Sequence, residues 1–160
     1  MNYLTWIITV VIAVAPWAAI NLYVMLKSKP RYSYLPYGYF LIIAALIYPM
    51  ARTVPEPHIF DETLTFVQHF LGGGFISVLY YLYVKYQLKL RPNYIIEPLY
   101  IYAFVSSMGV ANELLEFTAT KLHIYTLDSS DVWYDLLANT LGACVAYAGY
   151  RIAIVLLRKK

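Results

Sequence analysis

The chain has 160 residues, of which 61% are hydrophobic and only 13% are charged. Soluble domains usually have about a quarter charged residues and no more than about half apolar ones, so this composition excludes an ordinary soluble domain. The net charge of +3 is small, and a single cysteine excludes a disulfide framework and a cysteine-based zinc motif. We expect one transmembrane domain over residues 1–160.

Five apolar segments are candidates for membrane-spanning helices. A hydrocarbon core of about 30 Å requires about 20 mostly apolar residues in helical form. The first segment, at about 3–26, has no charge and contains Pro16, which predicts a kink. Basic residues follow this segment rather than precede it, which favours a retained span over a signal peptide. The other four segments lie at about 35–50, 60–84, 94–117 and 132–157.

Basic residues set the orientation of these spans. With five spans and short loops, ten of the twelve Lys and Arg residues lie on one side, and only Arg52 and Lys121 lie on the other. An excess of this kind is typical of cytoplasmic loops. We therefore predict an all-α, polytopic transmembrane helix bundle of about five helices in a cell membrane, with the N-terminus outside and the C-terminus in the cytoplasm.

Acidic residues gather on the opposite, outer side. Eight of the nine lie there, and Glu97 alone starts a helix from the cytoplasmic end. A charged side chain at membrane depth costs roughly 2.5–3.5 kcal/mol, so those within spans should face partners or water. The polar residues that share helix faces are Asp61 and His69 on the third span, Glu113 and Glu116 on the fourth, and Asp131, Asp135 and Asn139 on the fifth.

Small residues accompany these polar faces. Gly72, Gly73 and Gly142 lie on or beside the same stripes, where they would let the helix backbones approach closely. Alternatively, the glycine run at 72–74 could mark a broken helix that lines a binding site. We predict that the third, fourth and fifth helices pack around a polar pocket that opens to the outside.

Two segments resemble known membrane proteins. The segment GVANELLEFT…DSSDVWYDLLANTLGA resembles the VanZ-like family, because Glu113 matches that family's Glu. Asp135, Asn139 and Gly142 match its Asp-x-x-x-Asn-x-x-Gly run. The segment FDETLTFVQHFLGGG is similar to the related YjdF-type inner-membrane proteins. The resemblance covers about residues 58–150 and implies a cell-envelope role linked with low-level resistance to glycopeptide antibiotics, but no particular reaction.

The polar residues have more than one chemical interpretation. His69, Glu113 and Asp135 are candidate ligands for a divalent metal, and one His with carboxylates suits Mg, Mn or Ca better than structural zinc. The alternative, which we favour, is a hydrogen-bonded network that locks three helices together. Asp131 and Asp135 could act as an acid and base pair, or they could stabilise the N-terminus of the fifth helix.

Two functions follow from these interpretations. In the first, the outer pocket binds an amphipathic ligand, such as a lipid headgroup or a lipid-linked cell-wall intermediate. In the second, the chain is a membrane-embedded, metal-assisted hydrolase or transferase that acts on a lipid-linked substrate. A proton-coupled transporter is disfavoured because the cytoplasmic halves of the spans hold no matching acidic or His relay. Membrane lipids are expected partners; nucleic acids and nucleotides are not, since the basic residues set topology and no Gly-rich phosphate loop is present.

Overall fold

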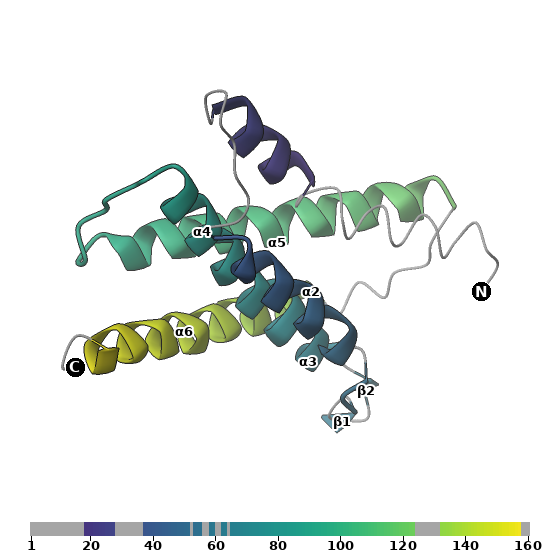
Figure 1. The fold of residues 1–160 in the computed structure, drawn as a ribbon. Helices are drawn as coiled ribbons and strands as arrows, with labels where there is room; N and C mark the ends of the chain where they lie inside the picture. Colours follow the sequence, from purple (N-terminus) through teal and green to yellow (C-terminus); the bar gives the residue numbers. More distant parts are fainter. Residues whose placement is uncertain are drawn as a thin grey trace.

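A computed structural model describes residues 18–27, 37–51, 53–55, 58–59, 62–63, 65–123 and 132–157 (Figure 1). Helices account for nearly all of this part of the chain, so the all-α prediction is confirmed. The elements in chain order are a helix at Ala18–Lys27, α2 (Tyr39–Ala51), β1 (His58–Ile59), β2 (Glu62–Thr63), α3 (Phe66–Gln68), η1 (His69–Phe75), α4 (Ile76–Gln87), α5 (Glu97–Lys121) and α6 (Val132–Leu157).

The expected third span differs most from its predicted bounds of 60–84. The backbone at β1 and β2 forms a two-residue antiparallel hairpin, in which His58 pairs with Thr63. Helical structure begins only at Phe66 and then continues without a break through α3, η1 and α4 to Gln87. The glycine run 72–74 lies within η1, a π-helix of seven residues. The helix is therefore widened at the glycines and is not broken there.

The last two expected spans are long helices. α6 coincides with the predicted 132–157, and its 26 residues extend about 39 Å at 1.5 Å per residue. α5 has 25 residues and begins three residues later than the predicted 94, because Asn93 first forms a turn. The side chain of Asn93 accepts a hydrogen bond of 2.9 Å from the amide of Ile95. α5 begins and α6 ends at the same side of the molecule, so the two helices are antiparallel (Figure 1).

The first two expected spans are described less completely. Of the predicted 3–26, the structure describes a helix from Ala18 to Lys27, and the rest lies outside the described residues. α2 replaces the predicted 35–50 and has 13 residues with Pro49 inside it. Its length of about 20 Å is shorter than a hydrocarbon core of about 30 Å.

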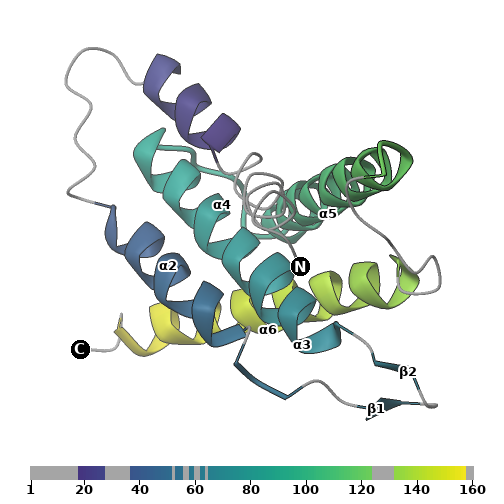
Figure 2. The same ribbon diagram turned by 90° about the vertical axis from the view of Figure 1, so that its right-hand side faces the viewer.

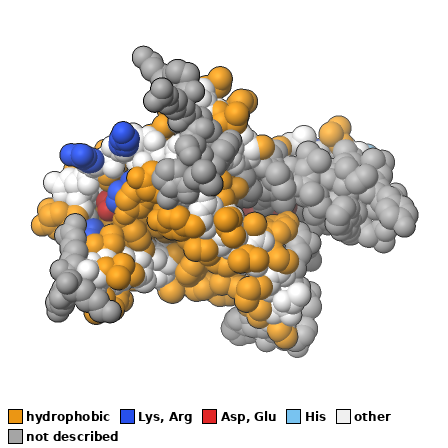
Figure 3. All heavy atoms as spheres, in the orientation of Figure 1, with side chains coloured by type: hydrophobic (Ala, Val, Ile, Leu, Met, Phe, Trp, Pro, Cys, Tyr) orange, Lys and Arg blue, Asp and Glu red, His pale blue; other side chains and the backbone are white. Residues whose placement is uncertain are grey.

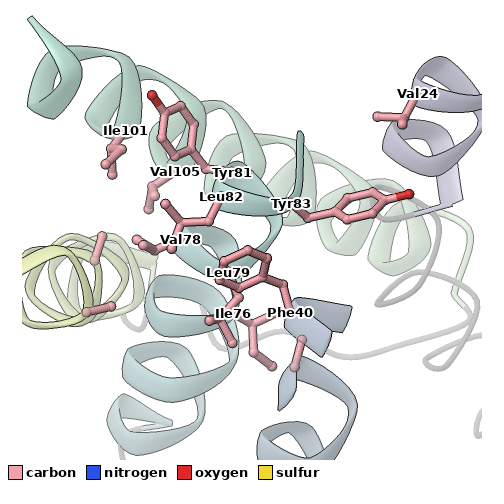
Figure 4. Close-up of a cluster of buried hydrophobic side chains, with 13 residues drawn as sticks. Val24, Phe40, Ile76, Val78, Leu79, Tyr81, Leu82, Tyr83, Ile101 and Val105 are labelled. Carbon is pink, nitrogen blue, oxygen red and sulfur yellow. The ribbon is translucent and has the colours of Figure 1, made fainter. Parts of the chain in front are cut away.

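The continuous helix α3–η1–α4 is the central element. It contacts α2, α5 and α6, and Figure 2 shows α4 between α2 and α5. Large buried side chains of α4 fill the core (Figure 4), among them Val78 and Leu82. Ile101 and Val105 of α5 meet them from one side, and Phe40 of α2 meets them from another. This core holds three helices around the segment that carries His69.

The outer surface of the helices is strongly apolar. Hydrophobic side chains cover most of the described part of the face in Figure 3, and the visible Lys and Arg side chains gather at one end of it. Within the described ranges, α6 is the one helix that is long and apolar enough to cross a membrane. Only 17% of its most apolar 18-residue window is buried, whereas the core helix of a soluble protein would be mostly buried.

Candidate functional site

Asp135 is the centre of a polar cluster between α6 and the α3–η1 segment. It lies in the first turn of α6, and only 3% of its surface is exposed. One of its oxygens, Oδ1, accepts a hydrogen bond of 2.9 Å from the hydroxyl of Thr65, which precedes α3. The other, Oδ2, lies 3.2 Å from Nε2 of His69 in η1. Both carboxylate oxygens are therefore held by residues of a different helix.

Glu113 brings α5 into the same cluster. One ligand atom each from His69, Glu113 and Asp135 can be chosen so that all three lie within 4.8 Å of one another. Atoms bound to a divalent cation at about 2.0–2.2 Å cannot be more than about 4.4 Å apart, so a small inward movement would allow all three to bind one ion. The structure thus brings together three residues that are far apart in the sequence, since His69 and Asp135 are separated by 66 positions.

Asn139 lies next to this cluster, one helical turn after Asp135 along α6. Its side-chain oxygen occupies the space that a Cβ at Gly73 would take, and its Nδ2 is 3.1 Å from the place of a Cβ at Gly109. Gly73 follows His69 by four residues, and Gly109 precedes Glu113 by four. The two glycines therefore make room for one amide side chain between three helices.

The side-chain oxygen of Asn139 is a buried acceptor. Asn139 is 4% exposed, and its Oδ1 has no hydrogen-bond partner within the part of the chain that the structure describes. Leaving a buried acceptor unpaired costs about 1–3 kcal/mol, so such groups in native proteins usually face bound water or a ligand. Together with the cluster above it, Asn139 forms a site that is rich in hydrogen-bond acceptors.

Close packing of η1 against α6 positions these side chains. A Cβ at Gly142 would overlap the carbonyl oxygen of Phe70, and a Cβ at Gly74 would overlap the Asn139 carbonyl oxygen. Gly73 and Gly142 thus lie at close contacts between helices, whereas nothing in the described part of the chain lies within 4 Å of a Cβ built at Gly72. A π-helix closes its hydrogen bonds from i to i+5, so the face expected from ordinary helical spacing is shifted.

Three other predicted site residues do not join the described cluster. Glu116 accepts a hydrogen bond of 2.9 Å from Nδ2 of Asn112 on its own helix, and it is not one of the three clustered ligand residues. Asp61 and Asp131 lie outside the described residues. The proposed pairing of Asp131 with Asp135 therefore stays a prediction.

A second polar cluster, which the sequence-based expectations do not include, surrounds Glu97. Glu97 starts α5 as expected, but it is only 3% exposed. It forms an ion pair with Lys85 of α4, and Nη1 of Arg151 of α6 lies 3.7 Å from its Oε2. The hydroxyl of Tyr147 donates a hydrogen bond of 3.2 Å to Oε2, and that of Tyr81 lies 3.4 Å from Oε1. This carboxylate therefore links α4, α5 and α6.

A spacing signal for this second cluster is present in the sequence. Tyr81 and Lys85 are four residues apart, as are Tyr147 and Arg151. Residues four apart lie on one face of a helix, so each pair offers a hydroxyl and a cation to the same neighbour. Glu97 is the only acidic residue on the predicted cytoplasmic side, so it was the available partner for both pairs.

Comparisons with known proteins do not indicate a function for this chain. No protein-family model matches the chain, and comparisons with curated proteins and with solved structures find no match. The resemblance to VanZ-like and YjdF-type proteins therefore stays a prediction that rests on the residues quoted for it.

Proposed function

We propose that this chain is a multi-pass integral membrane protein of the cell envelope, whose outer polar site binds the polar part of an amphipathic ligand. The bundle would have five spans, with the N-terminus outside and the C-terminus in the cytoplasm. The apolar outer surface of α5 and α6 and the ten-to-two distribution of basic residues support this arrangement. α2 is short for a span, and local thinning of the bilayer would accommodate it.

One observation carries the proposed binding role. His69, Glu113 and Asp135 converge from three helices above Asn139, whose buried oxygen has no partner in the described part of the chain. Two carboxylates and an amide oxygen accept hydrogen bonds, so the bound group should donate them or carry positive charge. Sugar hydroxyls and an ammonium group meet this requirement, whereas a bare phosphate does not.

The ligand class follows from this chemistry and from the position of the site. A lipid headgroup that carries an amine, or the sugar of a lipid-linked cell-wall intermediate, would present donors to the site while its hydrocarbon chain stays in the bilayer. Such a role would fit the glycopeptide resistance that the VanZ-like resemblance implies. Membrane lipids are partners in either case.

Lipid analysis of the purified protein tests this function. Mass spectrometry should find a co-purifying amine- or sugar-headed lipid with the wild-type chain. Asp135→Asn should remove it, because the variant loses the charge that Thr65 and His69 hold in place. Glu116→Gln is the matched control, since it makes the same chemical change on a residue outside the cluster. Retention of the lipid by Asp135→Asn, or its loss from both variants, would contradict the proposal.

A second function is a metal-assisted hydrolase or transferase that acts on a lipid-linked substrate. It is favoured by the mutual distances of His69, Glu113 and Asp135, which suit one divalent cation. Titration with Mn²⁺, followed by electron paramagnetic resonance, should then show one site per chain that is lost in His69→Ala. If wild-type protein binds no Mn²⁺, Mg²⁺ or Ca²⁺ near one equivalent, the site serves ligand binding without a metal.

A further inference from the structure

A narrow apolar groove runs between α5 and α6 on the side of the Glu97 cluster. Its floor consists of Ile101, Val105 and Ala143, which are 3–5% exposed, and Cys144 is an exposed residue of its lining. The volume is about 70 Å³, far below the roughly 300–1,000 Å³ of ordinary small-molecule sites. An occupant must therefore be slender and apolar, as a hydrocarbon chain is.

One end of the groove is polar and positively charged. Tyr147 lines the groove, and its hydroxyl accepts a hydrogen bond of 3.2 Å from Nη1 of Arg151, one turn further along α6. The Arg151 side chain is 38% exposed, whereas the carboxylate of Glu97 beside it is buried. The apolar groove thus leads directly to a solvent-accessible guanidinium.

The charges at this end do not cancel. Lys85 and Arg151 supply two positive charges, and Glu97 supplies one negative charge, which leaves a net charge of +1. The described contacts of Arg151 use Nη1, and a guanidinium has five N–H donors in a planar fork that fits phosphate oxygens. A single phosphate would neutralise the cluster and would use the exposed part of the fork.

We infer that this groove and Arg151 form a binding site for one anionic phospholipid. An acyl chain lies along Ile101, Val105 and Ala143, and the phosphate contacts the guanidinium. The site is distinct from the outer polar site, which takes a hydrogen-bond donor instead of an anion. It lies at the end that the basic residues assign to the cytoplasm, where the bilayer surface is anionic.

Native mass spectrometry of protein released from mixed vesicles tests this site. Vesicles of equal parts phosphatidylglycerol and phosphatidylcholine provide the same acyl chains with and without net charge. The wild-type chain should retain one phosphatidylglycerol in preference to phosphatidylcholine. Because one basic residue near a membrane surface contributes on the order of 1 kcal/mol, Arg151→Gln should reduce this preference about fivefold. Equal retention of the two lipids by the wild-type chain would overturn the inference.

Two further variants distinguish a specific lipid-binding site from non-specific electrostatic attraction. Arg158→Gln makes the same change of charge at the end of the chain, and it should leave the preference intact. Cys144→Phe adds a ring at an exposed position of the groove lining, and it should reduce phosphatidylglycerol retention although Arg151 is present. An equal effect of Arg158→Gln and Arg151→Gln, or an unaltered retention in Cys144→Phe, would overturn the site. Displacement of the lipid by 10-fold excess inorganic phosphate would also contradict it.

Discussion

Replacement of Gly142 by Ala should separate η1 from α6 and destabilise the whole polar site. A Cβ at this position would overlap the carbonyl oxygen of Phe70 and lie 2.9 Å from its carbonyl carbon. Both are backbone atoms, so no change of rotamer can relieve the contact. Overpacking of this kind costs about 1–3 kcal/mol, and we expect the upper end because a helix must move.

The magnitude follows from a comparison within one helix. Gly→Ala in a helix interior gains about 1 kcal/mol of helix propensity, which leaves a net loss of about 2 kcal/mol for Gly142→Ala. Gly149 lies in the same helix, and no atom of the described residues lies within 4 Å of its Cβ position. Gly149→Ala should therefore gain about 1 kcal/mol, since it has the propensity term alone.

Unfolding in mixed detergent micelles measures this difference. Circular dichroism at increasing mole fraction of sodium dodecyl sulfate gives the free energy of unfolding of each variant. We expect the two alanine variants to differ by about 3 kcal/mol, with Gly142→Ala the less stable. If they unfold together, η1 and α6 do not pack through Gly142, and the positions of His69 and Asn139 relative to α6 would be wrong as well.

Three more changes test the two polar clusters. Lys85→Met should lower the free energy of unfolding by about 3 kcal/mol, because it leaves the buried Glu97 carboxylate with less compensating charge. The double variant Lys85→Met/Glu97→Gln should recover most of this loss. A double variant no more stable than the single one would refute the pairing. Thr65→Val should cost about 2 kcal/mol through the lost hydrogen bond to the charged Asp135, measured by the same unfolding assay, and no loss would exclude this contact. Asn139→Ala should change the free energy of unfolding by less than about 1 kcal/mol, because it removes an unpaired buried acceptor. The same variant should abolish co-purification of the ligand in the lipid analysis. An unaltered lipid content would show that Asn139 is not part of the site.

The helices were predictable where apolar residues run without interruption. α6 follows its predicted bounds because residues 132–157 carry few charges and no proline. The third span begins later than expected because the strands His58–Ile59 and Glu62–Thr63 form a short hairpin at its predicted start, which hydropathy does not distinguish from a helix end. The local pairing of His58 with Thr63 decides this boundary, and the hydropathy of the segment does not reveal it.

The cluster of His69, Glu113 and Asp135 was predictable from helical spacing, and the second cluster was not. Spacing predicts that these three residues line one polar pocket, and they do meet. Gly72 lies in a π-helix, which changes the phase of the face that it presents, and ordinary helical spacing does not predict this change. Glu97 was interpreted as an ordinary acidic residue at a helix start, which explains its position but not its burial. Its partners lie 12 to 54 positions away, so only the packed structure brings them together.

The two polar clusters are built as matching layers on the same three helices. Each helix contributes one Lys, Arg, His, Asp or Glu residue to each layer, and the two on each helix lie sixteen positions apart. These pairs are His69 and Lys85, Glu113 and Glu97, and Asp135 and Arg151. Along the α-helices α5 and α6, sixteen residues rise about 24 Å, a little less than a hydrocarbon core of about 30 Å. In the proposed orientation each layer therefore lies about 3 Å inside its boundary of the bilayer, with mainly apolar packing between them. A charged residue at that depth needs a partner, but a lipid headgroup can still reach it. Both layers would therefore suit the recognition of lipid headgroups. The layer at the proposed outer end offers hydrogen-bond acceptors, and the layer at the proposed inner end has a net positive charge.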